Sequence, residues 1–233
     1  MSTQDAPKYD DLNNRYPGDF RSGEIILYGY NGTQFDISGL TAVVNVYQNL
    51  DSPFLSGNIL FFDTMGIQTS LPIVGNEHLE FKFRNPIDAA GDEELNATNH
   101  RFKVYEKRSV KTQQNVQAIA LFFTSIESVR NERVRVSKSL EGSFAEMVDK
   151  LVKSDKQLLN SKKDLFIDET LGNYKYTFPN VRPIDGVRSL ADLAEPVNFK
   201  TPHYMFYENN RGFHFRCLES LYREGADTTQ NRK

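Results

Sequence analysis

The first half of the chain consists of short apolar runs, rich in β-branched and aromatic residues, with turn-forming residues between them. Residues 78–84 alternate strictly, with Leu79, Phe81 and Phe83 separated by charged residues, which is the period-two pattern of a strand with one wet face. Asn31-Gly32 stands between two such runs and is a strong hairpin signal. The expected strands are residues 24–30, 33–38, 41–47, 55–63, 78–84, 101–106, 115–127 and 131–136. About seven or eight strands with turns between them suit an antiparallel barrel or sandwich.

The period changes after residue 137, where apolar residues recur at helical spacing. A stripe at i, i+3, i+4 and i+7 predicts an amphipathic helix over residues 139–153. The stripe consists of Phe144, Met147, Val148 and Leu151. Ser143 and Ser139 are both candidate N-caps, and only Ser143 has a glutamate, Glu146, three residues later to complete a capping box.

A second helix is expected over residues 183–194, with Pro183 in its first turn and Pro196 just beyond its end. Between the two helices, residues 153–164 read as a charged connection and 165–168 as a short apolar strand.

An aromatic hairpin is expected near the end of the chain, over residues 204–218. Its apolar positions alternate on both sides of a polar turn at residues 208–212, in which Gly212 can adopt positive φ. The hairpin residues that we expect to matter for the structure are Tyr204, Phe206, Glu208, Gly212, Phe213, His214 and Phe215.

Together these elements predict a mainly β protein with a smaller α+β part: an antiparallel, tail-tube-like β-barrel followed by a unit of two helices and a β-hairpin. Residues 1–20 are polar and are expected to form a flexible arm, because they hold too little apolar surface to offset ordering. The barrel is assigned to residues 21–137, the α+β unit to 138–222, and a polar, structureless tail to 223–233.

Composition narrows the range of functions. The net charge is −3, which argues against a protein that grips nucleic acid through a cationic surface. The single cysteine, Cys217, cannot form an intramolecular disulfide, which suits a reducing compartment. No apolar run is long enough to span a bilayer, and the first residues lack the pattern of a signal peptide. We therefore expect a protein assembled in the cytoplasm of a cell, with no membrane binding.

Catalytic and metal-binding motifs were not found. The sequence has no glycine-rich phosphate loop, dinucleotide fingerprint, H-E-x-x-H or nucleophile elbow. The four histidines are never three to five residues apart, which excludes a helical zinc pair. We expect no enzyme activity, no cofactor and no metal ion.

The aromatic pairs Phe61-Phe62 and Phe122-Phe123 each place one ring on either face of an expected strand. One ring of each pair can fill the barrel. The other ring meets either a neighbouring subunit or another part of the same chain.

Residues 181–194 followed by 204–215 resemble the baseplate hub proteins of T-even-like contractile-tailed phages. These belong to a superfamily with the late-control hub proteins of other phages and the N-terminal half of type VI secretion spike proteins. The shared order is a short helix, then aromatic-x-aromatic, an acidic residue, a turn, and Gly-aromatic-His-aromatic. Residues 37–63 also look like the first tube-type barrel of such a hub.

The resemblance implies a noncatalytic structural component of the virion, in the tail baseplate, assembled in the host cytoplasm. Members form a trimeric ring in which each chain contributes two similar barrels, so that the ring connects a hexameric tail tube to a trimeric central spike. The implied partners are further copies of the chain, the tail tube protein, the central spike protein and baseplate wedge proteins, with DNA only as passing cargo.

This chain departs from that pattern, because only one barrel can be found in it. A homotrimer is expected from the resemblance, and a hexamer of single-barrel chains is the alternative. Two other classes of function stay open on the residues alone. One is a monomeric β-barrel that binds a small molecule, with the C-terminal unit as a lid; the other is a cell-wall hydrolase attached to a tail.

Overall fold

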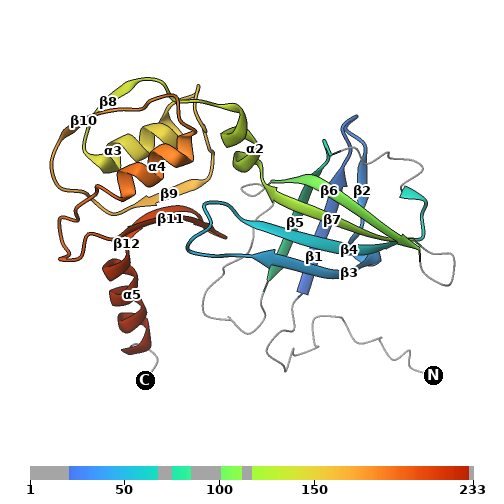
Figure 1. Cartoon of the computed structure of the whole chain (residues 1–233). Helices are drawn as coiled ribbons and strands as arrows, with labels where there is room; N and C mark the ends of the chain where they lie inside the picture. Colours follow the sequence, from blue (N-terminus) through green and yellow to red (C-terminus); the bar gives the residue numbers. More distant parts are fainter. Residues whose placement is uncertain (1–20, 68–74, 85–100, 112–116, 231–233) are drawn as a thin grey trace, which may run out of the picture.

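The computed structural model describes residues 21–67, 75–84, 101–111 and 117–230. They form two units side by side, a sheet unit and an α+β unit, and helix α2 leads from one to the other (Figure 1). The expected arm at residues 1–20 lies outside the described residues.

A seven-stranded antiparallel sheet makes up the first unit. Its order is β2-β1-β5-β6-β7-β4-β3, and it curls into half a barrel. The strands are β1 (Arg21–Tyr28), β2 (Gln34–Asp36), β3 (Thr41–Tyr47), β4 (Ser56–Asp63), β5 (His78–Arg84), β6 (Phe102–Lys111) and β7 (Gln117–Ser125), with a 3-10 turn η2 (Ser38–Leu40) before β3. β2 and β3 are therefore the two edge strands.

The concave face of this sheet holds the first core. Strict alternation along β4 and β7 turns Ile59, Phe61, Leu121 and Phe123 inward, and all four side chains are fully buried. Gly57 makes this packing possible, because a Cβ there would lie 2.2 Å from the backbone oxygen of Asn45. Burying the concave face stabilises the curl, since each large apolar side chain removed from water contributes roughly 1.5–3 kcal/mol.

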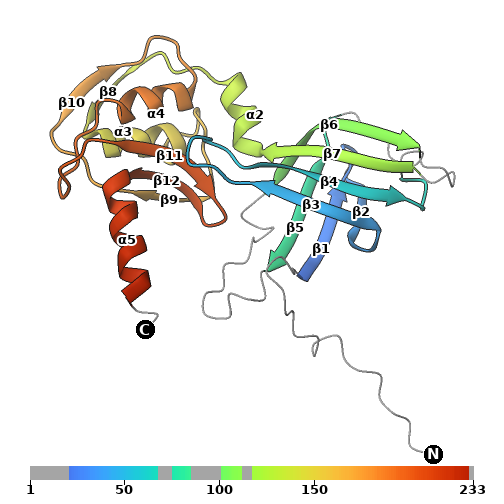
Figure 2. The ribbon, with the colours of Figure 1, turned by 60° about the horizontal axis from the view of Figure 1, so that its bottom comes forward.

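The α+β unit contains a three-stranded sheet of order β11-β12-β9 and a two-stranded sheet of β10 and β8. Helix α2 (Ile126–Arg133) leads into this unit. The elements that follow are β8 (Ser139–Gly142), α3 (Phe144–Asp149), a π-helical turn η3 (Lys150–Ser154), β9 (Asp164–Ile167), β10 (Tyr174–Thr177), α4 (Pro183–Ala191), β11 (Tyr204–Asn209), β12 (Gly212–Cys217) and α5 (Leu218–Gln230). Figure 2 shows α3 and α4 on one face of the three-stranded sheet and α5 projecting from the other side.

The second core lies between α3, α4 and this sheet. The helical stripe read from the sequence is buried there, together with Val187 and Leu190 of α4. The capping box at α3 is present: the Ser143 side chain accepts from the Glu146 backbone N–H, and the Glu146 carboxylate accepts from the Ser143 N–H. Pro183 begins α4, as expected.

The expected fold class is confirmed, and so is most of the order of elements. Two predictions are wrong. Residues 131–136 are not a strand: α2 runs from Ile126 to Arg133, so the strand expected over 115–127 ends at Ser125. The expected structureless tail is helical as far as Gln230, because α5 passes through most of it.

Helix and strand limits also differ in the α+β unit. Residues 139–142 form strand β8, paired with β10, instead of the first turn of a helix. Neither strand carries a strong apolar pattern, which explains why the sequence did not indicate them.

Candidate functional site

The aromatic hairpin has two faces with different surroundings. β11 and β12 pair so that Asn209 is opposite Gly212, which leaves a two-residue turn. Phe206 stacks on Phe213 with ring centroids 5.4 Å apart, and both rings belong to the core beneath α3 and α4. Gly212 has φ +142°, and a Cβ on it would lie 2.3 Å from the carbonyl oxygen of Asp164. The glycine therefore lets β12 pair closely with β9.

The second pair of aromatic residues, Tyr204 and Phe215, lies on the same core face. The two rings stack at 4.8 Å, and the Tyr204 hydroxyl donates to the carbonyl of Glu169 at 2.8 Å. Burial raises the pKa of Tyr204 well above its usual range. The phenol therefore stays neutral and acts as a structural donor.

His214 is on the opposite face, stacked between two aromatic rings. Its centroid lies 4.9 Å from that of Tyr207 and 4.7 Å from that of Phe166. Nε2 bonds the Asn209 side-chain oxygen at 2.9 Å, and that oxygen already accepts two backbone N–H groups. Nε2 must therefore carry the proton, while Nδ1 is buried with no hydrogen-bond partner among the described residues.

This arrangement keeps the imidazole neutral. Burial, together with the positive charges of Arg216 and Arg211, lowers the pKa of His214 to about 4. Protonation would place an N–H at Nδ1, where no described residue accepts it.

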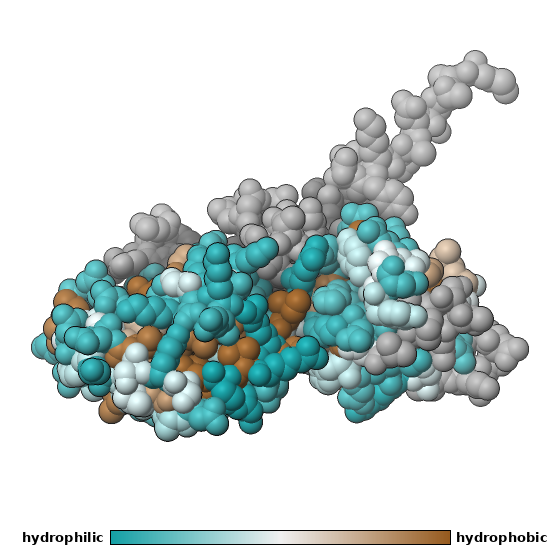
Figure 3. Space-filling model, turned by 90° about the horizontal axis from the view of Figure 1, so that it is seen from above, coloured by the Kyte–Doolittle hydropathy of each residue, from teal (hydrophilic) through white to brown (hydrophobic). Residues whose placement is uncertain are grey.

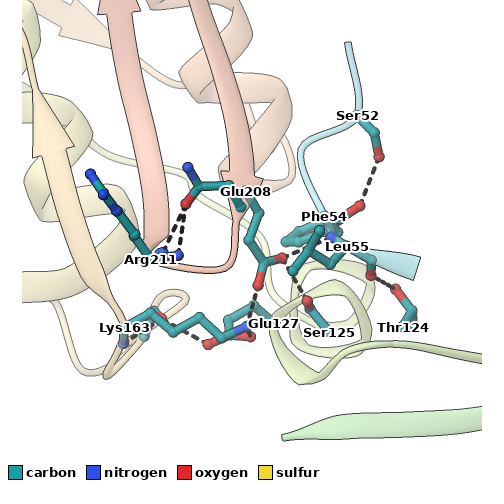
Figure 4. A network of polar contacts seen from close by, with 12 residues as sticks. Ser52, Phe54, Leu55, Thr124, Ser125, Glu127, Lys163, Glu208 and Arg211 are labelled. Atoms are coloured by element: carbon teal, nitrogen blue, oxygen red, sulfur yellow. Dashed lines mark hydrogen bonds and ion pairs between the residues drawn. The ribbon is translucent and has the colours of Figure 1, made fainter. Parts of the chain in front are cut away.

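Glu208, the acidic residue of the hairpin, joins the two units (Figure 4). One carboxylate oxygen accepts from the backbone N–H of Leu55 at 2.9 Å and from the Ser125 hydroxyl at 2.5 Å, both in the sheet unit. The other oxygen lies 2.5 Å from Nζ of Lys163. Glu208 lies near the turn of the three-stranded sheet. Its carboxylate thus accepts the backbone N–H of Leu55, just before β4 of the seven-stranded sheet, in place of a backbone carbonyl.

Lys163 lies between two carboxylates and is 2% exposed. Its Nζ is 2.7 Å from Glu127 of α2, whose other oxygen accepts from the Ser161 hydroxyl at 2.7 Å. We call Glu127, Lys163 and Glu208 the junction triad. Breaking such a buried group by removing one partner is costly, because it leaves an uncompensated charge.

The electrostatics of the junction triad are those of one cation shared by two acids. Burial raises the pKa of Glu208 above its usual range, although Lys163 opposes that shift. Burial also acts to lower the pKa of Lys163, but the two carboxylates outweigh it and the pKa lies above its ordinary value. On acidification, a proton therefore goes to Glu208 while the lysine stays charged.

Apolar and polar contacts extend the junction on either side of the triad. Phe54, in the β3–β4 loop, meets the ring of Phe213 edge-on at 6.2 Å. Asn131 of α2 accepts the backbone N–H of Ile184 at 3.0 Å, so that α2 satisfies a free donor in the first turn of α4.

The hairpin residues expected from the sequence therefore do not form one site. Four aromatic residues fill the core, Gly212 allows close strand pairing, Glu208 reaches the sheet unit and His214 faces away. Sequence reasoning missed Glu127 and Lys163 completely, because both lie in charged stretches whose partners are far away along the chain.

The outer face of the sheet unit is the side of β3, β4, β6 and β7 opposite the first core. It carries Val43, Leu60, Phe62, Tyr105 and Phe122, and three of these are exposed. Phe61 is buried and Phe62 is exposed, as the alternation predicted. Arg108 lies over the Phe122 ring, 4.7 Å from its centroid.

A second exposed apolar group lies on the α+β unit; we call it the loop patch. Leu171, Leu193 and Val197 are brought together where the Leu171 N–H donates to the carbonyl of Glu195 at 2.8 Å and Thr170 pairs with Pro196. In the view of Figure 3, apolar residues gather over the α+β unit, while the visible side of the sheet unit is mostly hydrophilic.

The described residues contain neither a cluster of metal ligands nor a membrane-spanning helix. Nowhere in that part of the chain do three or more His, Cys, Asp or Glu residues gather closely enough to hold a metal ion. Within the same residues, no helix has both the length and the apolar character needed to cross a membrane.

Comparison of the structure with known proteins found similar folds. A 43 kDa tail protein of prophage MuSo2 from Shewanella oneidensis matches with a TM-score of 0.51 at 9% identity, over 83% of this chain and 54% of that one. The prophage tail protein gp18 of Listeria monocytogenes matches with a TM-score of 0.52 at 12% identity, over 84% and 51%. The chain shares its fold with these two tail proteins. It spans about half the length of these two.

No protein-family model and no curated protein sequence matches the chain. The likeness is therefore one of fold, at identities too low to carry residue roles from one protein to another.

Proposed function

We propose that this chain is a structural subunit of a phage tail, and more narrowly a baseplate hub subunit. In this proposal, copies of the chain form a ring that connects the tail tube to the central spike. The observation that carries it is the combination of a tail-protein fold with an open, half-barrel sheet whose outer face exposes aromatic and aliphatic side chains.

The sheet unit is suited to pairing with further copies. Strand β3 has seven residues and lies at the edge of the sheet formed by the described strands. An edge strand beside an apolar face favours strand addition from another molecule. Head-to-tail contacts that close on themselves give a ring. We propose a homotrimer, with a hexamer as the alternative, and we assign the ring contacts to residues 21–137.

The α+β unit, residues 138–222, is then the part that contacts the layers above or below the ring. Its loop patch is separate from the outer face of the sheet and suits a second kind of partner, the tail tube, the central spike or a wedge protein. The junction triad would hold the two sets of contacts in a fixed relation.

The alternative of a small-molecule barrel has less support. The concave face is filled by thirteen buried apolar residues, including Phe61, Phe102 and Phe123, where a ligand cavity would have to lie.

The test is the mass of the protein in solution, measured by light scattering alone and with tail tube and spike proteins added. A mass three or six times the 26.7 kDa of one chain supports the ring and selects its symmetry. A species that stays monomeric at high concentration and with both partners present overturns the proposal.

Two matched variants separate the proposed contacts. Phe62→Lys places a charge on the outer face and should reduce ring formation while leaving the folded monomer intact. Leu193→Lys places the same charge on the loop patch and should weaken partner binding without changing the mass of the ring.

A further inference from the structure

A hollow of about 490 Å³ lies beside the junction, between the two units. Its walls come from β5, from Arg101 just before β6, from α2, and from the segment at residues 159–162. Ile126 and Leu159 give it an apolar floor, and cationic side chains surround that floor.

The acidic groups in its walls are already satisfied. Glu80 pairs with Arg101. Glu127 is 5% exposed and is held by Lys163 and Ser161 within the junction triad. These carboxylates therefore have little capacity left to neutralise further cations.

The other cations of the hollow have no acidic partner in the described part of the chain. Arg130 donates through Nε to the carbonyl of Leu158 at 2.6 Å and through Nη2 to that of Lys156 at 2.7 Å, so two neutral oxygens fix its guanidinium without cancelling its charge. Lys162 is exposed at the rim. An oriented guanidinium with spare donors favours a carboxylate ligand.

Further basic residues lie near Arg101. Burial lowers the pKa of His78, the positive charges of Lys103 and Arg101 lower it further, and Glu77 and Glu80 oppose the shift. Within the hollow itself, Arg101, Arg130 and Lys162 stand against two carboxylates that are already paired, which favours an acidic ligand.

We propose that the hollow is the docking site for the N-terminal segment of this chain, residues 1–20, through its acidic stretch Tyr9-Asp10-Asp11-Leu12. The two adjacent carboxylates match Arg130 and Lys162, and the flanking Tyr9 and Leu12 match the floor formed by Ile126 and Leu159. The segment as a whole carries four aspartates against one lysine and one arginine.

The segment can reach the hollow from its own chain. β1 pairs with β5 so that Arg21 is opposite Arg84 and Ile26 opposite Glu80, which places the start of β1 about 15 Å from the wall of the hollow. The residues between Asp11 and Arg21 span up to about 33 Å when extended, which is ample. Docking would hold the N-terminal segment at the seam of the two units.

The experiment uses the full chain and a fluorescein-labelled peptide of residues 1–20, followed by fluorescence anisotropy. In wild-type protein the chain's own segment competes, so the peptide should bind at least tenfold more weakly than it binds to an Asp10→Asn/Asp11→Asn chain. Binding to that variant should weaken several-fold between 50 and 300 mM salt. Equal binding to the two chains overturns docking within the chain, and no binding to either overturns the site.

Matched variants locate the contact. In the Asp10→Asn/Asp11→Asn chain, Lys162→Glu should reduce peptide affinity at least fivefold. Lys175→Glu makes the same charge change on exposed β10 and should leave it unchanged. A peptide with both aspartates replaced by asparagine should bind at least tenfold more weakly than the wild-type peptide. Equal effects of the two lysine variants would reduce the interaction to general charge attraction and overturn the proposal.

Discussion

The seven-stranded sheet and the three-stranded sheet differ in how the chain covers them. The three-stranded sheet has α3 and α4 on one face, and its other face carries the His214 stack with α5 beside it. The seven-stranded sheet is filled on its concave face but leaves Val43, Phe62 and Tyr105 exposed on the outer face. Exposed apolar groups of this kind mark interaction surfaces. The outer face of the sheet unit is therefore the surface to which we assign the proposed ring contacts.

The largest effect is expected from a comparison of Phe61 and Phe62, two neighbouring residues of β4 that lie on opposite faces of the sheet. Phe61→Ala should destabilise the protein by about 4 kcal/mol, because it removes a fully buried ring and leaves a cavity. Phe62→Ala should cost less than about 1 kcal/mol and instead weaken self-association. Chemical unfolding with urea measures the first effect and light scattering the second. Similar stability losses for the two variants would show that the outer face is covered within the chain.

The next effect concerns the junction between the two units. Lys163→Met should cost about 3 kcal/mol at pH 7.5, because Glu127 and Glu208 lose their shared cation while buried. The loss should shrink towards pH 5, since Glu208 can then take up a proton. Lys175→Met changes an exposed lysine on β10 and should alter the free energy of unfolding by less than about 0.5 kcal/mol. Equal losses would mean that the triad adds no stability.

A smaller effect is expected from His214, on the outward face of the hairpin, which should make the stability of the protein depend on pH. The pKa of His214 is about 4 in the folded protein, against 6.5 when the residue is unfolded, so the unfolded chain binds more protons between these values. Stability should therefore fall as the pH drops from 6.5 to 4, by about 2 kcal/mol from this residue. His214→Phe keeps the ring stack and removes the titration. The variant also loses the hydrogen bond to Asn209, which lowers its stability at both pH values. Thermal melts should therefore show wild type losing more stability than the variant between pH 7.5 and 5; equal losses would contradict the assignment.

The smallest effect is local to the α+β unit. Ser143→Ala removes the N-cap of α3 and should cost about 1 kcal/mol. Ser139→Ala, at the candidate cap that the structure places in β8, should cost less than half of that. Urea unfolding curves measure both. A larger loss at Ser139 would contradict the assignment of the helix start.

Local patterns predicted much of the fold but missed elements that are held by distant polar contacts. The strands of the first unit followed from alternation, and α3 from its apolar stripe and capping box. Helix α2 was missed because its buried residues are Glu127 and Asn131, so it has no apolar stripe to detect. The helical course of α5 was missed because its sequence is polar, and its first turns are tied to β12 by Arg216 bonding Ser220 and Glu224.

The alternation of residues, the positions that face a core and the turns can all be recognised from the amino-acid sequence alone. These properties depend on neighbours a few residues apart, so periodicity and turn chemistry reveal them. The contacts of Glu208 with Lys163, 45 residues away, and with Leu55, 153 residues away, become visible only in the folded chain. Nothing in the sequence around the Glu208 carboxylate, the Lys163 amine or the Leu55 backbone N–H indicates which groups they contact. Their pairing exists only because folding removes all three from water in the same place.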